Sequence, residues 1–187
     1  MTSFPTVPSF AVASAGWSEE LLAHPAMRFM QSHDADMGSP GAAAHRAKPY
    51  FATPSFRYTK STGQSMTGAE AVEAGYAEMV MFAAHKHEPV ICVLTELEDG
   101  RDGYRLFAHA KMYVDLQGAP EGAEKKAIDA DGRAWELSLG GAFLCDIIKD
   151  DSGVLGFRFA SVQVFFDPTP ALGIAIKRGL VPVEMLL

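Results

Sequence analysis

Three side chains, far apart in the chain, are of the types that together transfer a proton. His109 lies in the strand-like run 104–116, Asp34 follows a helical pattern, and Tyr58 lies in the short strand-like run 56–59. A free imidazole titrates near pH ~6.5 and so exchanges protons near neutral pH. A carboxylate can orient it, or serve as the base itself when desolvated, and a phenol can stabilise an oxyanion. These residue types predict general acid–base catalysis by His109, Asp34 and Tyr58.

Further polar side chains are candidates for substrate binding. A second phenol could donate a hydrogen bond to an oxyanion, and an amide could position a substrate oxygen. The candidate set is Tyr113, Gln163, His33, Tyr76 and Asp167. Asp167 has a simple structural alternative, because an aspartate before Pro168 can cap the final helix.

The catalytic candidates also have structural alternatives. Along 104–116 the even-numbered residues are apolar and the odd-numbered ones, apart from Phe107, are polar, so the polar face is either a wet pocket or the outside of the sheet. If the polar face is the outside of the sheet, His109 is a partly exposed histidine at a subunit interface. Asp34 could simply be solvated at a helix end, and Tyr58 could be a half-buried packing residue.

Metal and thiol chemistry are not expected from the sequence. His85-Lys86-His87 resembles a metal clip, but no carboxylate or third histidine follows at a matching spacing. A solvated turn between a helix and a strand is expected there, and no metal or other cofactor. Cys92 and Cys145 both lie in apolar runs and are expected to be buried thiols.

Composition narrows the class of protein. The 187 residues are 48% hydrophobic and 21% charged, which is typical of a globular chain. A net charge of −7 without a Lys/Arg cluster argues against nucleic-acid binding. No apolar stretch approaches the length of a membrane span, and the amino terminus lacks the pattern of a signal peptide, so a cytoplasmic protein is expected.

The order of elements predicts one α+β domain. Residues 1–16 are expected to form a flexible arm, and 17–187 a single domain that ends in an apolar tail. Ser18 and Pro25 favour helix starts, and Thr67 to Glu70 form a capping-box pattern before an apolar helical stripe that includes Tyr76. Strands are expected at 90–97, 104–116, 134–148 and 154–166, followed by a short helix. The two-residue glycine run in 134–148 would permit strong bending.

Helices first and long antiparallel strands after them predict a cone-shaped barrel. A strongly bent, mostly antiparallel sheet would wrap around the N-terminal helices and leave one deep pocket. The tail 180–187 could close the pocket as a lid or pack on another subunit.

This order, with the phrases at 51–58, 68–72 and 166–172, resembles the nuclear transport factor 2-like superfamily, in its SnoaL-like and scytalone dehydratase-like branch. The resemblance covers roughly residues 18–180. It places the helix-end pair of a scytalone dehydratase on His33-Asp34, its tyrosine on Tyr58, its first strand histidine on His109 and its strand amide near Gln163. The second catalytic histidine has no counterpart, because that stretch reads Leu-Gly-Gly at 139–141.

The resemblance implies a cofactor-free lyase, isomerase or cyclase acting on a small apolar carbonyl compound of polyketide or terpenoid type. The missing histidine favours a chemistry other than that of scytalone dehydratase itself. The resemblance also implies a homo-oligomer, either a dimer or a trimer. The alternative is a non-catalytic ligand-binding or oligomerisation module of the same fold.

Overall fold

The computed structural model describes residues 9–38, 42–120, 122 and 124–182. Its helices are α1 (Glu19–Leu22), α2 (Pro25–Met37), α3 (Ala43–Arg46), α4 (Gly68–Met79) and α5 (Thr169–Lys177). Its strands are β1 (Ser9–Ala13), β2 (Arg57–Thr59), β3 (Ser65–Thr67), β4 (Phe82–Glu96), β5 (Gly103–Leu116), β6 (Ala127–Ile128), β7 (Ala134–Trp135), β8 (Leu137–Val154) and β9 (Phe157–Phe166).

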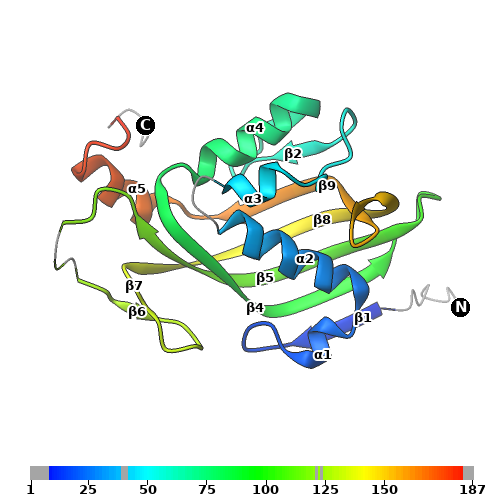
Figure 1. Ribbon diagram of the computed structural model, residues 1–187, viewed down its shortest axis with the longest axis horizontal. Helices are drawn as coiled ribbons and strands as arrows, with labels where there is room; N and C mark the ends of the chain where they lie inside the picture. Colours follow the sequence, from blue (N-terminus) through cyan, green and yellow to red (C-terminus); the bar gives the residue numbers. More distant parts are fainter. Residues whose placement is uncertain (1–8, 39–41, 121, 123, 183–187) are drawn as a thin grey trace, which may run out of the picture.

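One bent sheet and the helices on its inner face make up the fold. The sheet has seven strands in the order β1-β4-β5-β8-β9-β2-β3, and each neighbouring pair is antiparallel except β2 and β9. Figure 1 shows α2, α3 and α4 together on one face of this sheet, while β6 and β7 form a separate hairpin at one end. The predicted α+β architecture is confirmed, with the difference that the sheet does not close and leaves β1 and β3 as its edges.

The long strands acquire two different faces from their alternating side chains. In β5 the residues Leu106, Ala108 and Ala110 are buried, whereas Phe107 and His109 between them are exposed. Successive side chains of a strand point to opposite faces, so the apolar set packs under the helices and the other set lies outside. Leu106 and Ala108 join Phe29 of α2 and Phe159 of β9 in one core cluster.

The helix starts follow the predicted signals. The Ser18 hydroxyl accepts a hydrogen bond from the backbone N–H of Leu21, and Pro25 occupies the first turn of α2. Thr67 is the residue that precedes α4, but its side chain makes no capping hydrogen bond, so only the position of the capping box is confirmed. These starts place α2 and α4 where their apolar sides face the sheet.

Three segments differ from the prediction. Residues 9–13, expected in the flexible arm, form β1 and pair with β4, while 1–8 lie outside the described residues. The segment 85–87 is not a turn but part of β4, which begins at Phe82. β8 continues through the expected hairpin turn at 150–153, and the chain turns at Leu155-Gly156, where both residues have positive φ.

The tail residues 183–187 also lie outside the described residues, so a lid or interface role for them stays a prediction.

A buried ion pair fixes α5 to the sheet. Arg178, next to the end of α5, bonds both carboxylate oxygens of Glu136, with Nη1 at 3.1 Å from Oε2. The side chains are only 15% and 4% exposed. Glu136 also accepts the backbone N–H of Leu116 at 2.6 Å, and Arg178 donates to the Leu116 carbonyl at 3.2 Å. The pair therefore links the C-terminal helix to the end of β5.

Candidate active site

An apolar cavity of about 160 Å³ lies between the helices and the inner face of the sheet. Its walls come from α2, α4 and the inward-facing residues of β4, β5, β8 and β9. The few polar side chains among these walls are the candidates for chemistry: His33, Asp34, Tyr58, Tyr76, Glu78 and His87. An apolar cavity with a small number of polar groups is the usual form of a small-molecule site.

The principal polar contact of the cavity joins Asp34 of α2 to His87 of β4. Oδ1 of Asp34 lies 2.6 Å from Nδ1 of His87, and Oδ2 lies 3.4 Å from the backbone nitrogen of the same residue. Both side chains are largely buried, at 12% and 18% exposure. A carboxylate only accepts hydrogen bonds, so Nδ1 carries a hydrogen, and in the neutral ring Nε2 holds the lone pair. This arrangement orients a histidine base.

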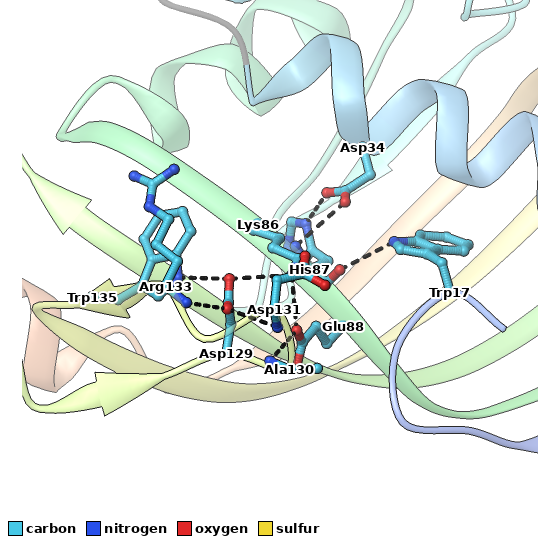
Figure 2. Close-up of polar contacts among 10 residues, drawn as sticks. All are labelled: Trp17, Asp34, Lys86, His87, Glu88, Asp129, Ala130, Asp131, Arg133 and Trp135. Atoms are coloured by element: carbon cyan, nitrogen blue, oxygen red, sulfur yellow. Dashed lines mark hydrogen bonds and ion pairs between the residues drawn. The ribbon is translucent and has the colours of Figure 1, made fainter.

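Hydrogen bonds also hold the strand around His87. They come from Trp17, which precedes α1, and from side chains on the outer face of the sheet (Figure 2). Trp17 donates a hydrogen bond from Nε1 to the backbone carbonyl of His87 at 3.2 Å. Strand alternation turns Lys86 and Glu88 to the opposite face of the sheet from His87, and Lys86 Nζ lies 2.9 Å from Glu88 Oε1. The imidazole is therefore fixed by its own backbone as well as by Asp34.

Two carboxylates from the β6–β7 hairpin bind Lys86 on the outer face of the sheet. Lys86 Nζ lies 3.1 Å from Asp129 and 2.8 Å from Asp131, and the surrounding acids raise the pKa of Lys86 well above its usual value. Asp129 in turn accepts a hydrogen bond from the indole of Trp135 at 3.0 Å. The hairpin therefore holds residues 86–88 in place from the face of the sheet opposite the cavity.

Two residues before His87, on the same face of β4, lies a second histidine. His85 is 9% exposed, and its Nε2 has no hydrogen-bond partner among the described residues. Burial and the neighbouring His87 lower the pKa of His85 to about 4, so the ring is neutral near pH 7. The ligand atoms of His85, His87 and Asp34 all lie within 4.8 Å of one another.

A second polar pair lies in the cavity wall formed by β2 and α4. The Tyr58 hydroxyl donates a hydrogen bond to Glu78 Oε2 at 2.7 Å. Burial and the Glu78 carboxylate raise the pKa of Tyr58 well above its usual value, so the phenol stays protonated. A protonated phenol can donate to a substrate oxygen.

The aromatic end of the cavity is occupied by buried rings. The Tyr76 hydroxyl lies 2.7 Å from Nδ1 of His45, and the His45 ring stacks on Tyr50 at 4.1 Å. His33 meets His45 edge to face at 4.6 Å. Burial lowers the pKa of His45 to about 4 and that of His33 well below its usual value. His33 and Tyr76 therefore contribute neutral, packed surfaces to the cavity.

Four of the predicted site residues do not line this cavity. His109 is exposed on the outer face of β5 and Gln163 lies on the outward side of β9, between the cavity residues Val162 and Val164. Tyr113 is buried on the outer face, with its ring centroid 6.3 Å from that of Trp135.

Asp167, the fourth of these residues, is exposed and accepts the backbone N–H of Thr169 at 2.9 Å. Asp167 therefore makes a local turn contact just before α5, one residue before the N-cap position Pro168, and is not itself the cap.

The structure does not bring His109 together with Asp34 and Tyr58, although the sequence predicted that it would. Strand alternation turns Ala108 and Ala110 toward the cavity and His109 away from it. The histidine that meets Asp34 is His87, one strand earlier. It was missed because 85–87 was interpreted as a turn, although His85 and His87 sit at the two-residue spacing of a strand face. Glu78 was also missed, although it lies seven residues after Ala71 on the inner side of α4.

Ligand entry should be visible in the emission of one tryptophan. Trp17 lines the cavity, whereas Trp135, the other of the two tryptophans, is buried outside it beneath the Arg133 guanidinium. A small apolar ligand should therefore change the fluorescence of the wild type and of Trp135→Phe, but not that of Trp17→Phe. A titration that gave the same change in Trp17→Phe would place the ligand elsewhere.

Comparison with known proteins identifies the fold. No protein-family model and no curated protein sequence matches the chain. Among solved structures, Aln2 from a Streptomyces species is 19% identical, with a TM-score of 0.53 over 84% of this chain and 98% of that one. A Novosphingobium aromaticivorans protein with the provisional name scytalone dehydratase is 11% identical, with a TM-score of 0.53 over 76% and 82%.

The same fold also includes a protein named for transport. Nuclear transport factor 2 from Cryptosporidium parvum is 13% identical, with a TM-score of 0.51 over 82% of this chain and 100% of that one. At these identities the likeness establishes the fold, and the function has to be argued from the cavity. Within the described residues, no helix has both the length and the apolar character needed to cross a membrane.

Proposed function

We propose that this chain, which has the nuclear transport factor 2-like fold, is an enzyme that moves protons on a small apolar carbonyl compound. The observation that carries the proposal is the 2.6 Å contact between His87 Nδ1 and Asp34 Oδ1 at the wall of an apolar cavity. A carboxylate-oriented imidazole with one nitrogen left for substrate is the arrangement of a general base.

The proposed reaction begins at a carbon next to a carbonyl group. Nε2 of His87 takes a proton from that carbon, and the electron pair of the C–H bond moves toward the carbonyl oxygen to form an enolate. Asp34 stabilises the imidazolium that results. The enolate then takes the proton back from His87 at another carbon of its conjugated system, expels a hydroxyl group from the neighbouring carbon that takes the His87 proton and leaves as water, or attacks a second carbonyl carbon whose oxygen takes that proton. These outcomes are isomerisation, dehydration and cyclisation respectively.

Tyr58 is the proposed hydrogen-bond donor to the enolate oxygen. Its hydroxyl now donates to Glu78 and would exchange that acceptor for the substrate oxygen. The exchange requires no ionisation of the phenol. His33 and Tyr76 would contact the apolar part of the substrate, because both line the cavity, the His33 ring packs on Phe159 and the Tyr76 hydroxyl is already bonded to His45.

The cavity limits the size and polarity of the substrate. A cavity of roughly 150 Å³ in another protein holds a benzene-sized molecule, so about 160 Å³ suits one ring with short substituents. Small cyclic ketones of polyketide or terpenoid type fall in this class. The alternative function is ligand binding without turnover, which the same apolar walls would support.

Hydrogen–deuterium exchange tests the proposal without knowledge of the natural substrate. The wild-type protein in D₂O is mixed with a panel of small cyclic ketones, and loss of the proton signal next to the carbonyl is followed by NMR. We expect catalysed exchange for ketones that also change Trp17 fluorescence. Ketones that bind, as that fluorescence reports, but do not exchange above the buffer rate would favour the binding module.

The outer face of the sheet is the proposed contact between subunits of a homo-oligomer. Ile91, His109, Ala142 and Phe165 lie side by side across β4, β5, β8 and β9, and Ile91 and Phe165 are 40% and 45% exposed. Exposed apolar rows of this kind commonly mark interfaces. His109, set within this row, is then an interface residue.

A charge in this row should dissociate the oligomer. Phe165→Glu places a carboxylate in a surface that would be desolvated on assembly, which costs several kcal/mol per interface (~2–5 kcal/mol). We expect light scattering on a sizing column to give a monomer mass for Phe165→Glu. Ile128→Glu, at an exposed apolar position of the β6–β7 hairpin, should keep the wild-type mass. A wild type that is itself monomeric at high concentration would refute the interface.

A further inference from the structure

Three potential metal ligands from two elements meet beside the cavity. His85 and His87 alternate along β4, so both rings point to the inner face of the sheet, and Asp34 approaches them from α2. One ligand atom of each residue lies within 4.8 Å of the other two. All three side chains are largely buried, which distinguishes them from exposed acidic groups.

We propose that Asp34, His85 and His87 bind one divalent transition-metal ion. Two imidazoles and one carboxylate suit ions such as Zn²⁺, Co²⁺ or Fe²⁺, whereas Mg²⁺ and Ca²⁺ favour sites made of oxygen atoms alone. Three protein ligands leave a coordination position open, and here it would face the cavity that Asp34 and His87 line.

The state of His85 supports a ligand independently of the Asp34–His87 contact. Its Nε2 is buried and has no hydrogen-bond partner among the described residues, although buried polar atoms in proteins are nearly always paired. The proposed acid–base reaction gives His85 no role. A metal ion would satisfy this nitrogen and would explain why a histidine occupies a site that leaves it unpaired.

The geometry requires only small movements to close around an ion. Ligand atoms at ~2.0–2.1 Å from one Zn²⁺ lie roughly 3–3.5 Å from each other. The present separations, up to 4.8 Å, can reach this range by side-chain rotation of about 1 Å. An ion bound at Nδ1 of His87 opens the contact of that nitrogen with Asp34, because the ion takes the place of the hydrogen between them.

Metal and proton therefore compete for the same two residues. The binding site stands by itself, but its regulatory consequence rests on the proposed function: with an ion bound, Asp34 no longer orients His87 as a base. We infer that transition-metal ions inhibit the metal-free reaction. Removal of metal with a chelator should restore it.

Cobalt binding measures the site directly. Untagged, chelator-treated protein is titrated with Co²⁺, while visible absorption reports imidazole coordination and equilibrium dialysis gives the stoichiometry. We expect one ion per chain, and affinity at least tenfold lower in His85→Gln. The matched control is His109→Gln, which removes an exposed imidazole from the other face of the sheet and should bind as the wild type does. Asp34→Asn is a second ligand variant in case His85→Gln does not fold.

The possible results separate the two proposals. Equal Co²⁺ affinity in the wild type, His85→Gln and Asp34→Asn, or no binding at millimolar Co²⁺, overturns the metal site. Deuterium exchange by the chelator-treated wild type supports the acid–base function whatever the metal result. Binding of one ion that depends on His85, with no exchange in the metal-free protein, supports the metal site and overturns the acid–base function.

Discussion

Replacement of His87 by glutamine should lower the catalysed deuterium-exchange rate by roughly 10²–10⁴-fold, the usual contribution of a positioned general base. Glutamine keeps the length and a hydrogen-bond donor toward Asp34, but it cannot accept a proton near neutral pH. Because the cavity walls are unchanged, the ketone should still alter Trp17 fluorescence with a similar midpoint. The rate should fall while binding persists, and this split identifies a base rather than a packing residue.

Two companion variants sharpen the result. Asp34→Asn should also slow exchange, and the double variant with His87→Gln should be little slower than either single one, because the two residues act as a unit. His109→Gln should exchange at the wild-type rate, since its imidazole lies outside the cavity. If His109→Gln lost activity and His87→Gln kept it, the assignment of the base would be wrong.

Glu136→Gln should be the most destabilising of the charge-removing substitutions, at about 3 kcal/mol. The change leaves the Arg178 guanidinium, which is 15% exposed, without its anionic partner. The matched control is Glu73→Gln at the exposed ion pair with Arg46, whose side chains are 65% and 43% exposed, where a loss of ~0–1 kcal/mol is typical. Urea unfolding of both variants gives the comparison, and equal losses would contradict the buried-pair interpretation.

The same pair should contribute to acid sensitivity. Hydrogen bonds from Arg178 lower the pKa of the Glu136 carboxyl in the folded state below its usual 4.5. A carboxyl with a depressed folded pKa stabilises the protein at pH values above its unfolded pKa. That stability is lost as the pH falls from about 4.5 through the lower folded pKa. Unfolding free energies measured between pH 7 and pH 3 should fall more steeply in the wild type than in Glu136→Gln.

The fold was predictable from the sequence because its signals are repeated over many residues. Alternation over the long run 104–116 predicted β5 to within one residue, and Ser18 and Pro25 predicted the starts of two helices by local stereochemistry. Where a segment lacked such repetition, the prediction failed. The edge strand β1 and the first half of β4 depend on pairing with distant residues rather than on their own composition.

The site was harder to predict because it depends on which face a side chain occupies. Asp34 and Tyr58 line the cavity, but whether the polar or apolar face of 104–116 turns inward cannot be decided from parity alone. The polar face is the outer one, so His109 points away from the cavity. His87 acquires its carboxylate partner from a helix 53 residues earlier, a contact that no local pattern encodes.

Because Asp34 and His87 are far apart in the sequence, the site forms only when the whole chain has folded. Contacts between residues distant in sequence form late and cost loop entropy, whereas helices and hairpins form from near neighbours. A collapsed intermediate could regain its circular dichroism while α2 was still undocked from β4. Recovery of the catalysed exchange after dilution from denaturant should therefore lag behind recovery of the far-ultraviolet signal, and its rate should report the docking of α2.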